Sequence, residues 1–482
     1  MRNVIRAALF ALVLTLVLAL APSTLLAEVS VKMAGDVRIY GQYFTNQNFT
    51  GWNPTGTRTE DAFQIWQRFR VRTDFAAGEA LKFRLGIRIN DTNWGGPSYQ
   101  VDNPAIDVEA YQVYLQFKFP GTSVRVTAGL QPVSLPHSAI FYDSPVLSSK
   151  HESNSSVAVI VEAPVIENVF AVNVGFDRLV DSNQRYDPTT TQVADEIDAY
   201  FAAFPVTLDG VSLTPWSMAT VVGDAAGPPN YIRNNLVSGG WFLTPGGFTE
   251  NQSLYWWAGG ALEVDALDPV KFYADVIYGQ GAMSGAERTR RQGWFIDAAV
   301  EYAGLAFMTP QLGLWYSTGE DDSLNNGSER MPAVNGNFGM GGSFLFPCDQ
   351  PFSKDAIGAD PVGAFGMAAS LNDISFMEKL KHRLTFTAMS GTSSARGLRQ
   401  AVLASGGNGQ YVTMGKNLAE GEWLMGANID STYNIYDNLG LHLETGWANF
   451  SGYRSSTWNS SRNFTGNVQD AWKVLVGLTY TF

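Results

Sequence analysis

The stretch WKVLVGLTYTF (472–482) decides how the rest of the sequence is understood. Apolar side chains stand at every second position: Trp472, Val474, Val476, Leu478, Tyr480 and Phe482. A β-strand points alternate side chains to opposite faces, so one face of this strand is apolar and aromatic throughout. In a soluble sheet, an edge strand with such a face and no charge on it would promote aggregation. The sequence therefore predicts that an apolar environment covers this face.

The same alternation recurs throughout the sequence. Apolar residues stand at alternate positions in the segments 31–43, 69–75, 81–89, 111–119, 256–264, 294–302, 423–429 and 439–447. Short joins such as 76–79 and 207–210 alternate with long stretches rich in Asn, Gly, Ser and Asp, such as 177–193, 224–251 and 319–361. Short turns at one end and long loops at the other are typical of membrane barrels, whose closed sheet pairs its backbone groups within lipid. The pattern predicts an all-β fold, a transmembrane antiparallel β-barrel of 16–18 strands.

Composition supports the barrel over a secreted β-sandwich, whose strands would alternate as well. Only 16% of the residues are charged, 13% are aromatic, and the aromatic residues stand near strand ends, as in the girdles of membrane barrels. The net charge of −13 argues against a nucleic acid as partner, because such a partner requires a basic surface.

The first residues have the layout of a secretory signal peptide. Arg2 and Arg6 form a basic start, 7–21 is apolar, and Ala27 provides a small residue for cleavage. We therefore expect a signal peptide at 1–27 and an outer-membrane β-barrel at 28–482. Cys348 is the one cysteine of the sequence, so no disulfide forms within the chain.

Charged side chains on the early strands share the face opposite the apolar one. A hairpin over 65–89 that turns near Gly78 would place Arg72 opposite Arg84 and Asp74 opposite Lys82. Like charges facing one another destabilise a sheet unless water or opposing carboxylates surround them. We therefore predict a water-filled lumen with a basic wall. Its predicted members are Arg38, Arg68, Arg70, Arg72, Lys82, Arg84, Arg88 and Arg125.

The later strands point acids into the same lumen. By parity these are Glu263, Asp265, Asp275, Asp297, Glu301, Asp430 and Glu444. The segment 131–153, with Asp143 and Glu152, is too apolar for a free surface loop, and we expect it to fold inward as a constriction loop with acids available to the basic wall. An ordinary packed surface loop is the alternative. Opposite charges on two walls would orient polar solutes and disfavour apolar ones.

These features together resemble the trimeric general porins of Gram-negative outer membranes, and more narrowly the homotrimeric porins of sulfate-reducing bacteria. The ending LVGLTYTF, with Tyr480 and Phe482, resembles the assembly signal that the barrel-insertion machinery reads in that class. The resemblance implies a homotrimer in the cell outer membrane, in contact with lipid and lipopolysaccharide. It also implies passive diffusion of small hydrophilic solutes and ions without a cofactor. In that class, acids of the inward loop face the arginines, a part that Asp143 and Glu152 would take here.

Other functions remain open. A substrate-specific channel for anions would use the basic wall, and one for sugars would use inward aromatics: Tyr40, Tyr114, Tyr255, Trp257 and Tyr273. A plugged structural barrel is a further alternative. An outer-membrane enzyme is disfavoured, because no G-x-S-x-G motif stands in a strand–turn–helix context. The segment GEDDSLNNGSE (319–329) offers oxygen ligands for a structural calcium ion, although its spacing does not match an EF-hand.

Overall fold

The computed structural model describes most of the chain after the first 28 residues. The described residues are 29–50, 62–96, 99–138, 141, 143–148, 155–181, 194–223, 226, 252–285, 287–335, 338–346, 356–404, 412–458 and 468–482. The predicted signal peptide at 1–27 and Glu152 lie outside this set. Within it, no helix has both the length and the apolar character needed to cross a membrane.

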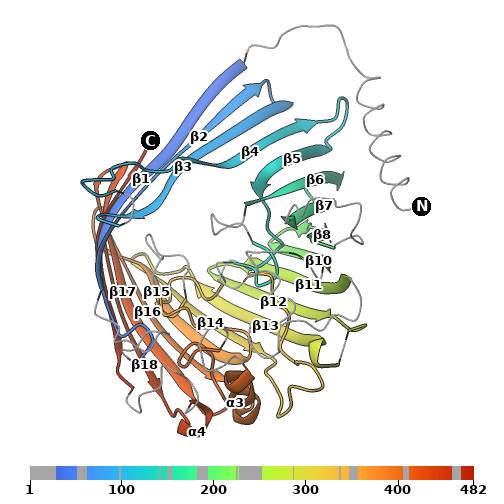
Figure 1. Ribbon diagram of the computed structural model, residues 1–482. Helices are drawn as coiled ribbons and strands as arrows, with labels where there is room; N and C mark the ends of the chain where they lie inside the picture. Colours follow the sequence, from blue (N-terminus) through green and yellow to red (C-terminus); the bar gives the residue numbers. More distant parts are fainter. Residues whose placement is uncertain are drawn as a thin grey trace.

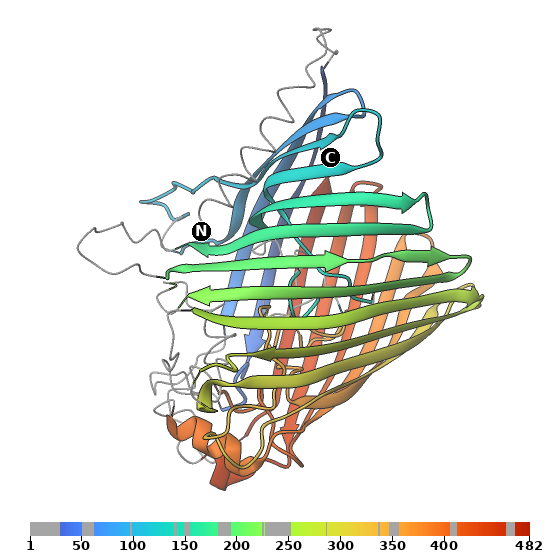
Figure 2. The ribbon, with the colours of Figure 1, turned by 90° about the vertical axis from the view of Figure 1, so that its right-hand side faces the viewer.

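A single antiparallel sheet closes on itself through the pairing of β1 with β19 (Figures 1 and 2). The strands are β1 (Val29–Thr45), β2 (Ala62–Ala77), β3 (Leu81–Asn93), β4 (Glu109–Lys118), β5 (Arg125–Pro132), β6 (Ser155–Ile166), β7 (Phe170–Asp181), β8 (Glu196–Ala203), β9 (Val206–Leu208), β10 (Val211–Gly223), β11 (Gln252–Leu267), β12 (Val270–Gly281), β13 (Arg291–Tyr302), β14 (Thr309–Ser317), β15 (Ala364–Met377), β16 (Leu380–Gly391), β17 (Trp423–Tyr436), β18 (Leu439–Ser451) and β19 (Ala471–Thr481). Because β8 and β9 both pair with β10, they are two parts of one interrupted crossing, and the wall has 18 crossings. The predicted antiparallel barrel is confirmed at the upper end of its expected strand number.

Short and long connections separate to the two ends of the barrel. The start of β1 and the end of β19 lie at the same end of the barrel as the short turns. The long connections carry the helical segments η2 (Glu287–Thr289), α3 (Ala395–Ala404) and α4 (Ser455–Trp458). The alternation of short and long connections that the sequence predicts is therefore confirmed.

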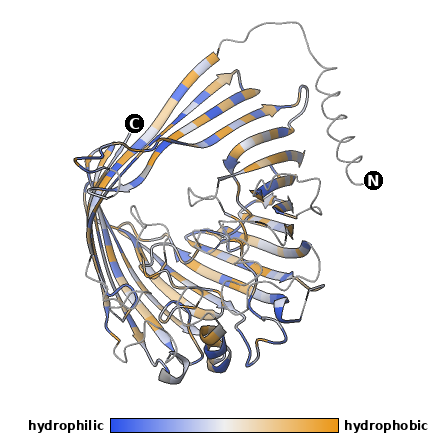
Figure 3. Cartoon of the chain, viewed as in Figure 1, coloured by the Kyte–Doolittle hydropathy of each residue, from blue (hydrophilic) through white to orange (hydrophobic). Residues whose placement is uncertain are grey.

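The closing strand β19 presents its apolar face to the outside of the barrel. Figure 3 shows how hydrophobic and hydrophilic residues are distributed along the strands of the wall. Trp472 is 55% exposed and Val476 52%, whereas Lys473 and Leu475 between them are buried inside. Exposed outer aromatics gather near both ends of the strands. Near the long loops these are Tyr43, Phe63, Trp256, Trp294, Tyr316, Phe365, Trp423 and Trp472, and near the short turns they are Phe75, Phe83, Phe272, Tyr302, Phe307, Phe376, Tyr433, Tyr436, Tyr480 and Phe482. An apolar belt between two aromatic girdles is the surface of a barrel that faces lipid.

The hairpin of β2 and β3 has the predicted parity but a different register. Asp74 lies opposite Arg84 rather than Lys82, and Arg72 lies opposite Gly86 rather than Arg84. The shift of two residues keeps every side chain on its face and changes only its partner. The expected facing of Arg72 and Arg84 is therefore wrong, and an acid–base pair, Asp74 with Arg84, stands in its place.

Two connections fold into the barrel and build a core there. The first inner loop joins β5 to β6 (133–154), and the second inner loop joins β14 to β15 (318–363). They meet where Phe141 bridges to Met340, and where the Asn335 amide donates to the Ser144 carbonyl oxygen at 3.1 Å. The inward fold of the first loop was predicted, whereas the second was expected only as a long connection.

Candidate functional site

A row of basic side chains follows the inner face of the first three strands. We call Arg38, Arg68, Arg70, Arg72, Lys82, Arg84 and Arg88 the basic row. In the sheet register Arg38 lies opposite Arg68 and Arg70 opposite Arg88, so the row descends along β2 toward the short turns. From Arg68 to the level of Arg84 it extends about 20 Å at about 3.4 Å per residue.

Acids of neighbouring strands neutralise part of the row. Asp36 on β1 lies 3.0 Å from Arg68 and 2.6 Å from Arg70. The other three ion pairs are Arg38 with Asp91 (3.1 Å), Arg84 with Asp74 (2.5 Å) and Arg88 with Glu109 (2.9 Å). Seven bases thus stand with four acids, which leaves an excess of three positive charges. These acids offset the repulsion among the bases, which allows so many cations to lie along one wall.

Two tyrosines of β4 line the lower part of the row. The Tyr114 ring lies 5.8 Å from the Arg84 guanidinium and 5.9 Å from Lys82 Nζ. The Tyr111 ring lies 5.5 Å from Arg88. Aromatic faces attract cations and hold long side chains in place, so these rings restrict the basic groups to the wall.

Arg125, the eighth predicted member of the basic wall, stands apart from the row. It lies at the start of β5 beside the short turns, is half exposed, and pairs with Glu162 at 3.3 Å. An exposed pair of this kind has a weak field in solvent.

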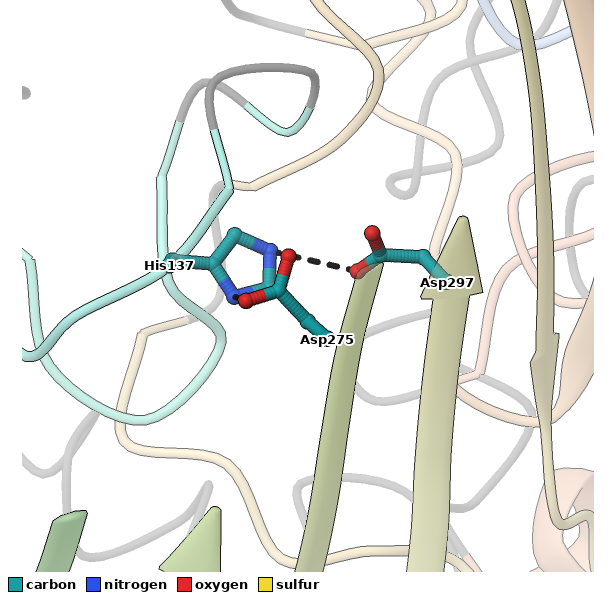
Figure 4. A group of neighbouring side chains, drawn as sticks. All are labelled: His137, Asp275 and Asp297. Carbon is teal, nitrogen blue, oxygen red and sulfur yellow. Dashed lines mark ion pairs between the residues drawn. The ribbon is translucent and has the colours of Figure 1, made fainter. Parts of the chain in front are cut away.

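The first inner loop is anchored to the opposite wall through His137 (Figure 4). The His137 Nδ1 atom lies 3.5 Å from Asp275 Oδ1 on β12, and Nε2 lies 3.3 Å from Asp297 Oδ2 on β13. The backbone N–H of Ser138 donates to both Asp275 oxygens, at 2.9 and 2.8 Å. Asp275 and Asp297 are directly opposite in the sheet. A histidine held between two opposed carboxylates relieves their repulsion when its ring is protonated, and we call these four residues the loop anchor.

The loop anchor differs in polarity from the contact expected between the loop acids and the basic wall, and that contact stays a prediction because Glu152 lies outside the described residues. The sequence predicted that acids of the loop would meet the wall, whereas the described contact places a histidine of the loop between two acids of the wall. Asp143 is buried and accepts a hydrogen bond from the Ser148 hydroxyl within the loop at 2.5 Å.

Aromatic packing fills the space between the two inner loops and the wall. Phe141 of the first loop packs on Phe295 with ring centroids 5.3 Å apart, and Phe295 packs on Phe338 of the second loop at 5.6 Å. The second loop continues across β17 and β18, where Asn428 accepts from the Phe344 N–H and donates to the Gly342 carbonyl oxygen. The two loops therefore cover the inner face from β11 to β18, the side away from the basic row (Figure 1).

The acids of the later strands separate into three groups. Asp275 and Asp297 belong to the loop anchor. Asp430 and Glu444 are each paired, with Arg383 and Lys473 at 3.3 Å in both cases. Glu263, Asp265 and Glu301 surround Tyr273 near the short turns, and within the described residues none of the three makes an ion pair. Two of the seven predicted acids are thus neutralised by ion pairs, two more share one histidine, and three are unpaired among the described residues.

Two groups of described side chains have the composition of metal ligands. His137, Asp275 and Asp297 offer ligand atoms within 4.8 Å of one another, and so do Glu320, Asp321 and Glu329. In the first group both Asp275 oxygens already accept the Ser138 N–H, which suits an anchor of the loop.

Three features of the lumen were not predicted from the sequence. They are the contact of His137 with the wall, the ion pair of Arg383 with Asp430, and the inward fold of the second inner loop. The loop had a signal in its sequence, since Phe338, Phe344 and Phe346 make it as apolar as 131–153. The two pairings had none, because they depend on register and on where a loop lands.

The arrangement defines an outer-membrane β-barrel with a partly filled lumen and one charged wall. No protein-family model matches the chain, and no curated protein matches its sequence. Solved structures match the fold. Pseudomonas aeruginosa OccK2 (OpdF) aligns with a TM-score of 0.52 and 11% identity, over 94% of this chain and 98% of that chain. OprD of the same organism aligns with a TM-score of 0.50 and 11% identity, over 96% of this chain and 99% of that chain. The structure of Pseudomonas aeruginosa OpdK with vanillate aligns with a TM-score of 0.51 and 11% identity, over 94% of this chain and 98% of that chain.

At this identity the likeness concerns the fold. The chain shares the β-barrel fold of these outer-membrane proteins, and this fold agrees with the predicted localisation. The likeness gives no support to the finer resemblance to trimeric porins of sulfate-reducing bacteria. The homotrimer, and the reading of Tyr480 and Phe482 by the insertion machinery, stay predictions.

Proposed function

We propose that the chain forms a selective outer-membrane channel for small anionic solutes, with the basic row as the wall along which they pass. The observation that carries this proposal is the excess of positive charge on β1–β3, opposite a wall where four of the seven predicted acids have a basic partner. This is more specific than general diffusion, because one charged wall in a narrowed lumen favours one sign of solute.

The shape of the lumen supports the same direction. The inner loops cover the inner face from β11 to β18. The strands that carry the basic row, β1 to β3, lie on the other side of the lumen (Figure 1). A solute that passes the loops is thereby brought close to the row, where a lumen bounded by low-dielectric walls strengthens electrostatic attraction. Hydrated carboxylates fit a row of guanidinium groups, since the planar fork of arginine matches a carboxylate.

A sugar channel is the weaker alternative. Of the inward aromatics predicted for it, Tyr255 and Trp257 are completely buried, and the Trp257 indole N–H donates to the Pro332 carbonyl oxygen of the second inner loop at 2.8 Å. Rings covered by protein cannot form a continuous stacking surface for sugars. A protein with the same fold, OpdK, has been crystallised with vanillate, an aromatic carboxylate, which is a precedent for anions in this architecture.

The double variant Arg72→Gln/Lys82→Gln tests the proposal. Among the described residues neither base makes an ion pair, so their loss removes positive charge without leaving a buried acid alone. A unit charge about 4 Å from a solute is worth about 1 kcal/mol in water, so we expect the anion-over-cation permeability ratio to fall about fivefold per charge. The measurement is the reversal potential in a planar bilayer under a salt gradient.

Lys381→Gln is the matched control, because Lys381 is exposed and pairs with Asp373 at 2.7 Å away from the row. Its selectivity should equal that of the wild type. If the double variant also matched the wild type, the basic row would not determine selectivity. If the folded, inserted wild type carried no current, the barrel would be plugged and the channel proposal wrong.

A further inference from the structure

The first part of the second inner loop brings three carboxylates together just beyond the end of β14. Glu320, Asp321 and Glu329 each place an oxygen within 4.8 Å of the other two. Oxygen ligands of calcium lie about 2.3–2.6 Å from the ion, so opposite ligands are separated by about 5 Å at most. The three side chains therefore already have the spacing of ligands around one ion.

Glu320 provides an observation that is independent of the spacing. Its side chain is only 2% exposed and points into the cluster, and neither carboxylate oxygen has a hydrogen-bond partner of normal geometry in the described part of the chain. A carboxylate buried in this way costs free energy unless a cation compensates it.

The charges around the cluster leave room for one divalent ion. Arg291 is buried beside Glu320 and Glu329 and supplies one positive charge. Arg330 is engaged with Asp360 at 2.5 Å, so that pair is neutral overall. Three carboxylates against one uncompensated arginine leave two negative charges.

The backbone holds both ends of the cluster in place. The Ser394 N–H donates to the Glu320 carbonyl oxygen at 2.7 Å, which ties this end to the start of α3. At the other end the Ser328 N–H donates to the Arg290 carbonyl oxygen at 2.9 Å, and the Asp321 N–H donates to Glu329 Oε2 at 3.2 Å. Fixed ends reduce the entropy that ion binding would otherwise cost, and the exposed Asp321 leaves a route for entry.

We propose that Glu320, Asp321 and Glu329 bind a calcium ion that holds the first part of the second inner loop in place at the end of the barrel with the long connections. Calcium fits better than magnesium, because three carboxylates with adjustable bite suit its 6–8 oxygen ligands, whereas magnesium demands near-ideal octahedral geometry. The site does not rest on the proposed channel function, since its residues stand outside the basic row and the loop anchor.

Equilibrium dialysis of the purified, EDTA-treated full chain against CaCl2 tests the site. We expect one saturable calcium per chain, and about tenfold or greater loss of affinity in Glu320→Gln, because calcium affinity follows the number of charged ligands. The exposed Asp321→Asn should weaken binding as well. The matched control Asp373→Asn removes an exposed acid from β15 and should bind calcium as the wild type does.

Thermal unfolding gives a second readout that does not depend on channel activity. Calcium should raise the melting temperature of the wild type and of Asp373→Asn but not that of Glu320→Gln. Without calcium, Glu320→Gln should be at least as stable as the wild type, since it removes a buried charge. Absence of saturable binding in the wild type, or equal affinity in Glu320→Gln, would overturn the proposal. Calcium binding with unchanged conductance would leave the channel proposal untouched.

Discussion

Gly35 shows how a single residue permits the barrel to close. Its N–H donates to the Phe482 carbonyl oxygen at 2.8 Å, and the Phe482 N–H donates back to its carbonyl oxygen at 3.1 Å. A Cβ at position 35 would lie 2.3 Å from the backbone oxygen of Arg70 and 2.5 Å from the Phe482 ring. Phe482, which follows the closing strand β19, thus lies on a backbone that has no side chain to displace it.

We therefore predict that Gly35→Ala destabilises the barrel by about 1–3 kcal/mol, because a backbone oxygen cannot move aside as a flexible side chain would. Gly41→Ala, on the same strand, is the control: the nearest atom to its added Cβ is 3.8 Å away, so its effect should stay within about 0.5 kcal/mol. Denaturant unfolding of the lipid-embedded barrel measures both. Equal stability of the two variants would show that closure at Phe482 tolerates a side chain.

At the same scale, the sequence could predict the face of a residue but not its partner. Alternation correctly assigned the arginines of β2 and β3 to one face, since a period of two survives any even shift in register. The partners depend on where the turn lies, and the true turn pairs Asp74 with Arg84. The ion pairs of Asp36 with two arginines cross from one strand to the next, which no local pattern specifies.

Among the elements, the two inner loops determine how much of the lumen stays open. Apolar composition was sufficient to predict that 131–153 folds inward, because such residues require cover. Where the loop lands was beyond the sequence, since His137 meets two aspartates that are 138 and 160 residues further along the chain. The same reasoning applied to 338–346 would have predicted the second inner loop.

Removal of His137 tests whether the loop anchor holds the first inner loop in place. His137→Ala leaves Asp275 and Asp297 opposed without the imidazole between them, and losing one partner of a buried ion pair costs about 3–5 kcal/mol. We expect the first inner loop to detach, with a larger and noisier single-channel conductance. His382→Ala is the control, since His382 contacts Ser431 on β17 at 2.7 Å and lies outside the anchor. An unchanged conductance in His137→Ala would mean that aromatic packing alone holds the loop.

For the whole molecule, the alternation of WKVLVGLTYTF was enough to predict the architecture. A strand with one continuously apolar face has few solutions, and a chain of such strands with short and long connections has essentially one. The distribution of charge was only partly predictable. The bases are concentrated on the early strands as expected. Of the acids that were expected to form an opposing wall, Asp430 and Glu444 pair with Arg383 and Lys473, and His137 lies between Asp275 and Asp297.

The sign of the reversal potential of the wild-type protein, in a planar bilayer under a potassium chloride gradient, tests the account most directly. The net charge of the chain is −13, so overall charge alone would favour cations. We predict anion selectivity, because the basic row lies where the loops narrow the lumen and its field is least screened. Cation selectivity of the folded, inserted protein would contradict it and would assign control of the channel to the acids near the short turns.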